Sequence, residues 1–311
     1  MQQLVLIGLI ALTCYLVIPG IGAVLIRRSR RAFRRRVVHA AGLRALSPHV
    51  SGRIGVPIER LGLFRFAGSL EAIQGQNTVW LRSPTLSVAV KMDGERVHMV
   101  PAEGEVAADG PESDGAPEHP LVALRWRKLH SIAEGTGFSV AGPAYREYGK
   151  LVFKGEAAEP LLVLVYDGDP GSVYERALWY GRRRNEYWNP LTLPSLVLGG
   201  VLLGSVAYGL LNSPFHHSLA VLAITLAALP LLPLLPPGVL FLLVYRRLWK
   251  RGRRKRAERD LLLFRDPSLA KSALDRGREA LLCESLALTT LLSGLVLNAY
   301  LVLNALTRLL L

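Results

Sequence analysis

The sequence predicts a multi-pass α-helical membrane protein with four spans and a small all-β domain, a barrel or a sandwich, inserted between the first two spans. Half of its 311 residues are hydrophobic, and the mean hydropathy of +0.29 is high for a soluble protein. The apolar residues are gathered in long runs, several of which end at a group of arginines. A polar segment with short strand-like stretches separates the first run from the second.

The first apolar run covers residues 4–26 and ends directly at Arg27 and Arg28. A secretory signal would carry its positive charge before the apolar core and a cleavage site after it. Residues 1–26 are therefore expected to form an uncleaved transmembrane helix. A basic juxtamembrane segment follows at 27–43.

The second predicted span is 190–211, which contains no charged residue. About 20 such residues cross a hydrocarbon core of roughly 30 Å. The residues just before this span combine basic and aromatic side chains that are typical of a membrane–water interface: Arg182, Arg183, Arg184, Tyr187 and Trp188.

The third predicted span, 219–245, contains four prolines: Pro230, Pro233, Pro236 and Pro237. Each proline removes a backbone donor from a helix, so the segment is either one kinked span or a broken one. A basic and amphipathic cytoplasmic segment is expected at 246–284, with Arg246, Arg247 and Trp249 at the interface. Its amphipathic helix would lie on lipid headgroups or pack on the soluble domain. The fourth span is expected at 285–307.

Half of the 38 basic residues lie in three windows, 27–36, 182–184 and 246–259. Basic residues mark the cytoplasmic side of a membrane protein. The windows therefore predict a plasma (bacterial inner) membrane protein with both termini outside and a cytoplasmic β domain. The net charge of +14 is then explained by topology and by contact with anionic headgroups of the bilayer, and no nucleic-acid partner is expected.

Small and amide side chains in the spans indicate helix packing. Small residues four positions apart let helix backbones approach closely, and buried amides need a partner on another helix, in the same chain, in a second copy or in another membrane protein. The candidate packing residues are Gly200, Gly204, Ser205, Gly209, Asn298 and Asn304.

The cytoplasmic domain is expected at 44–178. Its short stretches rich in valine, leucine and aromatic residues predict strands at 61–67, 78–81, 85–92, 121–129, 138–141, 151–154 and 161–166. Residues 101–120 are acidic and rich in glycine, alanine and proline, which predicts a disordered loop.

Several motifs of this domain resemble the GIDE family, a membrane-flanked domain also found in a mitochondrial ubiquitin ligase. They are Gly68 followed by Leu81–Pro84, the tryptophan strand Leu124–Trp126, the stretch Ile132–Gly142, and an apolar helix after the domain. The resemblance implies a β fold and a membrane-tethered role. It does not imply ligase activity, because a RING needs about eight cysteine and histidine ligands and no such cluster follows the domain.

The sequence contains no phosphate-binding glycine loop, no His-Glu-x-x-His and no Gly-x-Ser-x-Gly. Cys14 and Cys283 both lie in or beside apolar segments, so neither a disulfide framework nor a thiol metal site is expected. No catalytic, cofactor or metal site is predicted. The sequence favours a non-enzymatic scaffold or interaction module. The alternative is a lipid or small-solute transport component in which 219–245 lines a path, and a membrane-bound enzyme ranks third.

Overall fold

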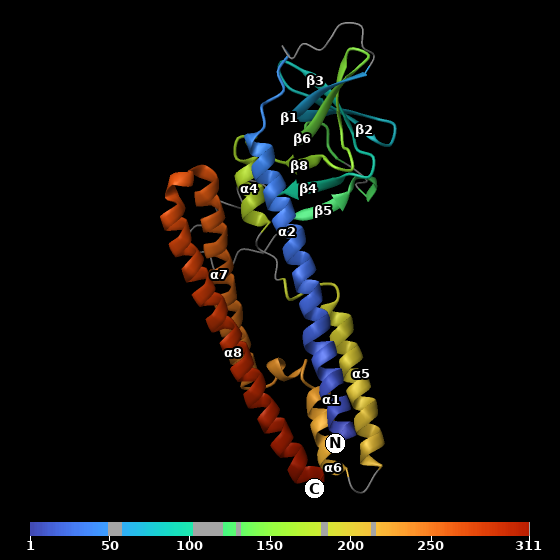
Figure 1. Ribbon diagram of the computed structural model, residues 1–311, viewed down its shortest axis with the longest axis vertical. Helices are drawn as coiled ribbons and strands as arrows, with labels where there is room; N and C mark the ends of the chain where they lie inside the picture. Colours follow the sequence, from blue (N-terminus) through green and yellow to red (C-terminus); the bar gives the residue numbers. More distant parts are fainter. Residues whose placement is uncertain (49–57, 102–120, 129–131, 182–185, 213–215, 311) are drawn as a thin grey trace. The chain divides into compact units, whose positions relative to one another are not determined.

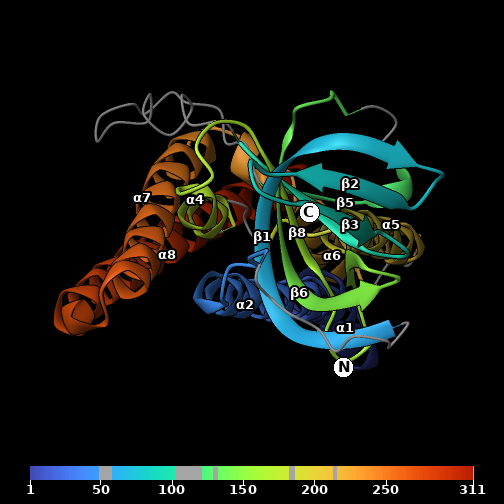
Figure 2. The same cartoon turned by 90° about the horizontal axis from the view of Figure 1, so that it is seen from above.

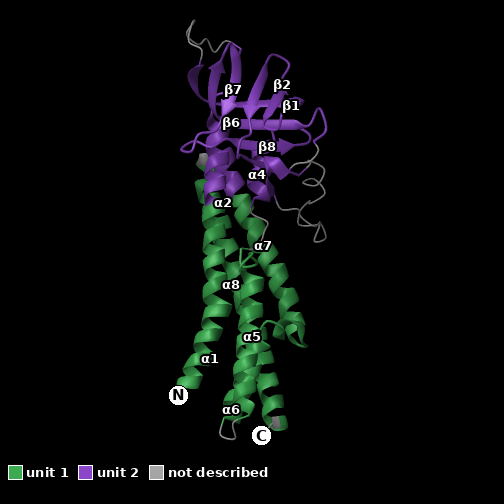
Figure 3. Cartoon of the chain, turned by 90° about the vertical axis from the view of Figure 1, so that its right-hand side faces the viewer, with its two compact units in different colours: residues 1–30, 185–259, 268–311 green, residues 31–184, 260–267 purple. Residues whose placement is uncertain are grey.

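The computed structural model describes residues 1–48, 58–101, 121–128, 132–181, 186–212 and 216–310. The chain divides into two compact units (Figure 3). The helical unit comprises Met1–Arg30, Asn185–Arg259 and Ser268–Leu311. The β unit comprises Arg31–Arg184 and Asp260–Pro267.

The β unit contains one mixed sheet in the order β1-β2-β3-β7-β6-β8-β4-β5, with a further pairing of β1 with β6. The pairs β3–β7 and β4–β8 are parallel. The strands are β1 (Ile58–Gln74), β2 (Thr78–Arg82), β3 (Ser87–Lys91), β4 (Arg96–Val100), β5 (Val122–Arg125), β6 (Gly137–Glu147), β7 (Lys150–Lys154) and β8 (Leu162–Tyr166) (Figure 1). The prediction of a strand-rich domain after the first apolar helix is confirmed.

Five of these strands close into a barrel because β1 pairs with β2 at one end and with β6 at the other. The register shifts between Arg60 and Gly62 and again between Leu70 and Ala72, and such bulges let a long strand bend. Figure 2 shows the resulting curvature of β1. Around the barrel the strands follow in the order β1, β2, β3, β7 and β6, and β3 and β7 are parallel.

Alternate residues of the barrel strands point inward and form its core. Val79 and Leu81 of β2, Val88 of β3, Phe138 of β6 and Phe153 of β7 are fully buried there. The indole nitrogen of Trp126 donates to the carbonyl oxygen of Gln76 at 2.8 Å. This barrel interior is the larger of the two cores of the β unit.

A second core lies where the sheet continues beyond the barrel through β8 and β4. Helix α4 (Val173–Tyr180) and the end of α2 (Ile18–Gly42) pack on these strands. Arg176 of α4 is buried, and its two terminal nitrogens donate to the carbonyl oxygens of Pro101, Asp167 and Asp169. The domain is therefore a mixed sheet with packed helices, and the expectation of an all-β domain is wrong in this respect.

In the described part of the chain, three helices are long and apolar enough to cross a membrane: Gln2–Gly42, whose last residues from Arg31 on belong to the β unit, Thr192–Leu211 and Ala270–Leu309. The first consists of α1 (Gln2–Leu12), a π-helical turn (Thr13–Val17) and α2. The others are α5 (Thr192–Leu211) and α8 (Ala270–Leu310). The remaining elements are α6 (His217–Ala227), η3 (Leu232–Leu234), α7 (Gly238–Arg265) and η4 (Pro267–Leu269).

The segment 219–245 is not one helix, because its proline-rich centre separates α6 from α7. Pro236 has no backbone N–H to donate to the carbonyl of Leu232, as an α-helix would require. Asn298 of α8 is buried and donates instead, to the carbonyl oxygens of Leu232 at 2.6 Å and Leu235 at 3.0 Å. Of the two readings of this segment, the broken one describes the structure.

The segment 246–284 forms the adjoining parts of α7 and α8, which run side by side (Figure 1). Gly252 lets the helices approach, since a β carbon there would lie 3.2 Å from the carbonyl oxygen of Ala280. The salt bridges Lys255–Glu279 at 3.1 Å and Arg256–Glu284 also join them. The expected amphipathic helix is therefore part of a long helical hairpin.

Candidate functional site

Charged and aromatic side chains converge in the helical unit just before α5. We call these six residues the arginine cluster: Arg27, Arg30, Glu186, Tyr187, Trp249 and Arg253. Nε of Arg27 lies 2.5 Å from one carboxylate oxygen of Glu186, and Nη1 of Arg30 lies 3.2 Å from the other. Arg27 also donates to the hydroxyl of Tyr187 at 2.9 Å. Two arginines of α2 are thereby joined to the chain that leads into α5.

Helix α7 adds Trp249 and Arg253, which are four residues apart and so lie on one helix face. The guanidinium carbon of Arg253 is 5.1 Å from the centroid of the Trp249 ring, within the range of a cation–π interaction. The Trp249 ring also packs on Tyr187, with centroids 5.6 Å apart. Trp249 is 7% exposed and Arg253 is 9% exposed, so the cluster has a largely dehydrated centre.

The arginines determine the charge state of the one carboxylate in the cluster. Burial by itself raises the pKa of Glu186, but the hydrogen bond from Arg27 and the charges of Arg253 and Arg30 outweigh it and hold the pKa below its usual range. Glu186 is therefore ionised at neutral pH. Burial lowers the pKa of Arg253, opposed by the charges of Glu186 and Glu284. Because a guanidinium stays protonated at any physiological pH, Arg253 remains a buried cation.

The backbone beside the cluster is fixed by Asn189, which is buried. Its amide nitrogen donates to the carbonyl oxygen of Pro19 at 3.0 Å, and its side-chain oxygen accepts from the N–H of Leu191 at 3.0 Å. A β carbon at Gly22 would overlap the Asn189 amide, so a glycine is needed on α2 for this approach. Asn189 thus joins the start of α5 to the first helix.

The structure places the predicted interface residues in different surroundings. Tyr187 and Trp249 belong to the arginine cluster. Trp188, Arg246 and Arg247 are exposed. Arg182, Arg183 and Arg184 lie outside the described residues, as do positions 102–120 of the predicted acidic loop.

Sequence reasoning did not single out Arg27, Arg30 or Arg253 as members of a common site. Arg27 and Arg30 are three residues apart on α2, and Trp249 and Arg253 are four apart on α7, so each pair lies on one helix face. That spacing was the available signal. The carboxylate that joins them is 159 residues from Arg27, and no local pattern indicates such a pairing.

The candidate packing residues are also separated by the structure. A β carbon on Gly200 would lie 3.5 Å from the carbonyl oxygen of Ala227, while Gly204 and Gly209 have open space at this position. Among the glycines of α5, the closest approach is at Gly199, where a β carbon would lie 2.5 Å from Cε1 of Tyr15. Ser205 donates to the carbonyl oxygen of Val201 in its own helix.

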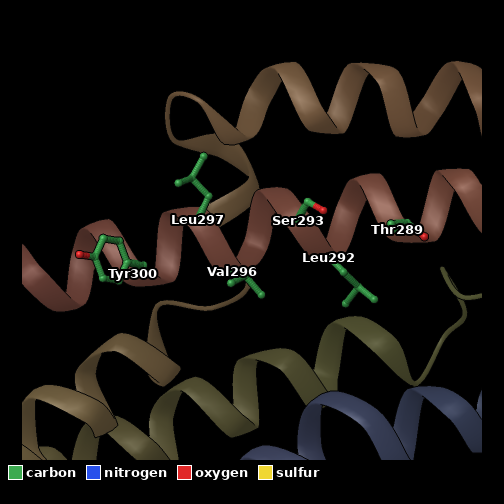
Figure 4. A pocket seen from close by; sticks show the side chains of 6 residues that line it. All are labelled: Thr289, Leu292, Ser293, Val296, Leu297 and Tyr300. Atoms are coloured by element: carbon green, nitrogen blue, oxygen red, sulfur yellow. The ribbon is translucent and has the colours of Figure 1, made fainter.

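The two candidate amides also lie in different surroundings. Asn298 is buried and bonded to the broken segment, whereas Asn304 is exposed on α8. An open hollow of about 620 Å³ lies along the same helix (Figure 4). Its lining residues are Thr289, Leu292, Ser293, Val296, Leu297 and Tyr300. Because all six come from α8, the hollow is a shallow stretch of helix surface.

The β unit contains a buried histidine at the contact between α2 and β4. The rings of His98 and Phe33 lie 4.5 Å apart, and His98 is 7% exposed. Burial, with smaller contributions from the charges of Arg36 and Arg96, lowers the pKa of His98 to about 4. The imidazole is therefore neutral at physiological pH.

Comparisons of the chain with protein-family models, with curated proteins and with solved structures find no match. Within the ranges that the structure describes, histidine, cysteine, aspartate and glutamate side chains do not gather in a group of three suited to a metal ion. Among the described residues, those of the arginine cluster are placed to bind a ligand. Their guanidinium groups are held in position and can bind an anion.

Proposed function

We propose that the protein is an integral membrane protein of the plasma (bacterial inner) membrane that acts as a non-enzymatic scaffold and presents its β unit to protein partners in the cytoplasm. The outward-facing apolar surface of the helical unit carries this proposal. Val201 of α5 and Val296 of α8 are 61% and 68% exposed, and many leucines of the same helices are exposed as well. Apolar surface on this scale is stable against lipid and unfavourable against water.

The helical unit supports four crossings of the bilayer, with α6, η3 and the first part of α7 forming a discontinuous third one. Both termini lie at the same end of this unit (Figure 1). In both α2 and α7 the apolar part comes first in the chain, and the basic part lies nearer to the end of the unit opposite the termini. With basic residues on the cytoplasmic side, the termini are outside and the β unit is cytoplasmic.

The edge of the sheet supports a protein partner. Strand β5 is the last strand, and in the described part of the chain it pairs only with β4. Met99 of β4 and Val122 of β5 are cross-strand neighbours, and both are exposed. An open edge beside an apolar pair is suited to the addition of a strand from another protein.

The test is to extract the full chain gently from its own membrane and record the proteins that remain bound. We expect a stoichiometric partner with the wild type and its loss with the double variant Met99→Lys/Val122→Lys, because two lysines at a sheet edge oppose strand addition. Tyr148→Lys, at an exposed hairpin position, is the matched control. A partner retained by the double variant, or no partner with the wild type, contradicts the scaffold proposal.

A lipid or small-solute transport component is the second candidate, and the broken segment favours it. Discontinuous helices within a membrane often line binding sites in transporters. This candidate requires a ligand-dependent change near η3, which a label on Leu231→Cys would report, since Leu231 is exposed beside the break. Labelling that is the same with and without added lipid or solute would count against transport.

A further inference from the structure

We propose that the arginine cluster is a binding site for a phosphate group, supplied by the headgroup of an anionic phospholipid. The proposal deepens the proposed function and rests on its membrane insertion for the source of the phosphate. It names a ligand class for a site built from α2, α7 and the chain before α5.

The charges of the arginine cluster and its neighbours are not balanced. Arg27, Arg30 and Arg253 surround Glu186, and the neighbouring pair Arg256–Glu284 adds one charge of each sign. These four arginines and two glutamates have a net charge of +2 at neutral pH. Partly buried charge is costly unless it is neutralised, and one phosphate of charge −1 or −2 would reduce or remove the excess.

The arginine cluster offers hydrogen-bond donors that suit a phosphate group. Arginine recognises phosphate through paired N–H groups in a fixed plane. Arg27 has a side chain that is 42% exposed, whereas that of Arg30 is 18% exposed, so the cluster is open on the Arg27 side. Nε1 of Trp249 is a buried donor without a hydrogen-bond partner in the described part of the protein. A buried N–H without an acceptor costs free energy, so an acceptor bound beside it would be stabilising.

The arginine cluster lies next to the start of an apolar helix. Glu186 precedes Thr192, the first residue of α5, by six positions, and the apolar part of α5 follows. The Trp249 ring packs between Tyr187 and Tyr245, and tryptophan and tyrosine collect at the headgroup level of a bilayer. In an inserted protein, the anion at this depth is the phosphodiester of a lipid.

The experiment measures the melting temperature of the purified full chain in a neutral detergent during titration with short-chain phosphatidylglycerol, short-chain phosphatidylcholine or inorganic phosphate. We expect phosphatidylglycerol to raise the melting temperature and phosphatidylcholine to have little effect. Arg30→Gln should raise the Kd for phosphatidylglycerol about tenfold or more, because it removes a charge-assisted hydrogen bond. Arg278→Gln, whose side chain is 73% exposed on α8, is the matched control and should leave the Kd unchanged.

Glu186→Gln gives a result that a misfolded variant cannot imitate. It removes the carboxylate that competes with the ligand, so phosphatidylglycerol should bind more tightly than it does to the wild type. A purely structural ion cluster would show no such gain. Equal responses to both lipids, unchanged binding by Arg30→Gln, or no gain with Glu186→Gln would each overturn the proposal.

Inorganic phosphate separates the two sources of the same chemistry. A response to inorganic phosphate as strong as that to phosphatidylglycerol, lost in Arg30→Gln, would keep the phosphate site and assign it to a soluble anion. Failure of membrane insertion alone would leave this binding measurable. The outcome for the site is therefore distinguishable from the outcome for the proposed function.

Discussion

The β unit buries apolar side chains in its interior, whereas the helical unit exposes many side chains of the same kind on its surface. In the β unit, Val79, Phe138 and Phe153 are fully buried inside the barrel. In the helical unit, Val201 and Val296 point outward and are largely exposed. Burial of such side chains from water is worth about 1.5 to 3 kcal/mol each, so their exposure in such numbers supports the proposed insertion of the helical unit into a membrane.

The comparison supports the proposal that the helical unit lies in a membrane. The barrel gains stability by removing apolar groups from water. The helices instead satisfy their backbone groups internally and leave apolar side chains outside, as lipid requires. Polar groups in the helical unit lie in particular places. Asn298 lies in the interior, at a break in the backbone, whereas the charged side chains gather in the arginine cluster and along the α7–α8 hairpin.

The largest expected effect comes from a cavity in the barrel. Phe153→Ala should lower the free energy of unfolding of the β unit by about 4 kcal/mol, because it removes a large side chain from a packed core. Leu198→Ala on α5, where the side chain is 49% exposed, should change stability by about 0.5 kcal/mol or less. Urea titration of the full chain in detergent, followed by tryptophan fluorescence, measures both. Equal losses of unfolding free energy in the two variants would contradict the difference between the two units.

Acid should destabilise the β unit through His98. Its pKa is about 4 in the folded protein against an ordinary 6.5, so the folded state favours the neutral ring. This contribution is complete above pH 6.5 and is lost as the pH falls towards 4, by about 3 kcal/mol in total.

Urea titrations at pH 7 and pH 4 provide the measurement for His98. His98→Gln should flatten the dependence on pH, while His39→Gln, at an exposed position of α2, should retain it. A slope that is the same in both variants would assign the acid sensitivity to other groups.

A smaller effect is expected at the break in the helical unit. Asn298→Ala should lower stability by about 2 kcal/mol, because two hydrogen bonds to the carbonyls of Leu232 and Leu235 are lost. Asn304→Ala, on an exposed part of the same helix, should have little effect. Thermal melting in detergent compares the two, and similar losses would mean that Asn298 does not stabilise the break.

The smallest effect distinguishes two glycines of α5. Gly199→Ala should cost about 1 kcal/mol or more, because its methyl group would overlap Tyr15 and lie 2.8 Å from the β carbon of Cys14. Gly204→Ala meets no atom within 4 Å and should be neutral or slightly stabilising in a helix. Melting temperatures in the same detergent give the answer, and a greater loss at Gly204 would reverse the assignment of the packing face.

The sequence was informative where the pattern was local. The alternation around Val79 and Leu81 predicted β2 to within one residue, and the charge-free stretch 190–211 predicted α5. Strand β4 was not predicted, because Arg96 and His98 interrupt its apolar pattern. Helix α4 was not predicted either, and its Tyr180 is buried in the β unit.

Other features depend on contacts that sequence patterns do not specify. Spacing of small residues pointed to Gly200 and Gly204, but it does not say which helix face meets a neighbour, and the tight contact is at Gly199. Residue type suggested Tyr187 and Trp249 for the interface. The hydrogen bond between Tyr187 and Arg27 joins positions that are 160 apart in the chain, and only the fold brings them together.

The most direct test of the account is the topology of the full chain in sealed cells. Cys14 and Cys283 are replaced by serine, and either Tyr148→Cys in the β unit or Leu309→Cys near the C-terminus is introduced, both at highly exposed positions. We expect a membrane-impermeant maleimide to label Leu309→Cys in intact cells and to label Tyr148→Cys only after permeabilisation. Labelling of Tyr148→Cys in intact cells, or recovery of the protein in the soluble fraction, would contradict the account.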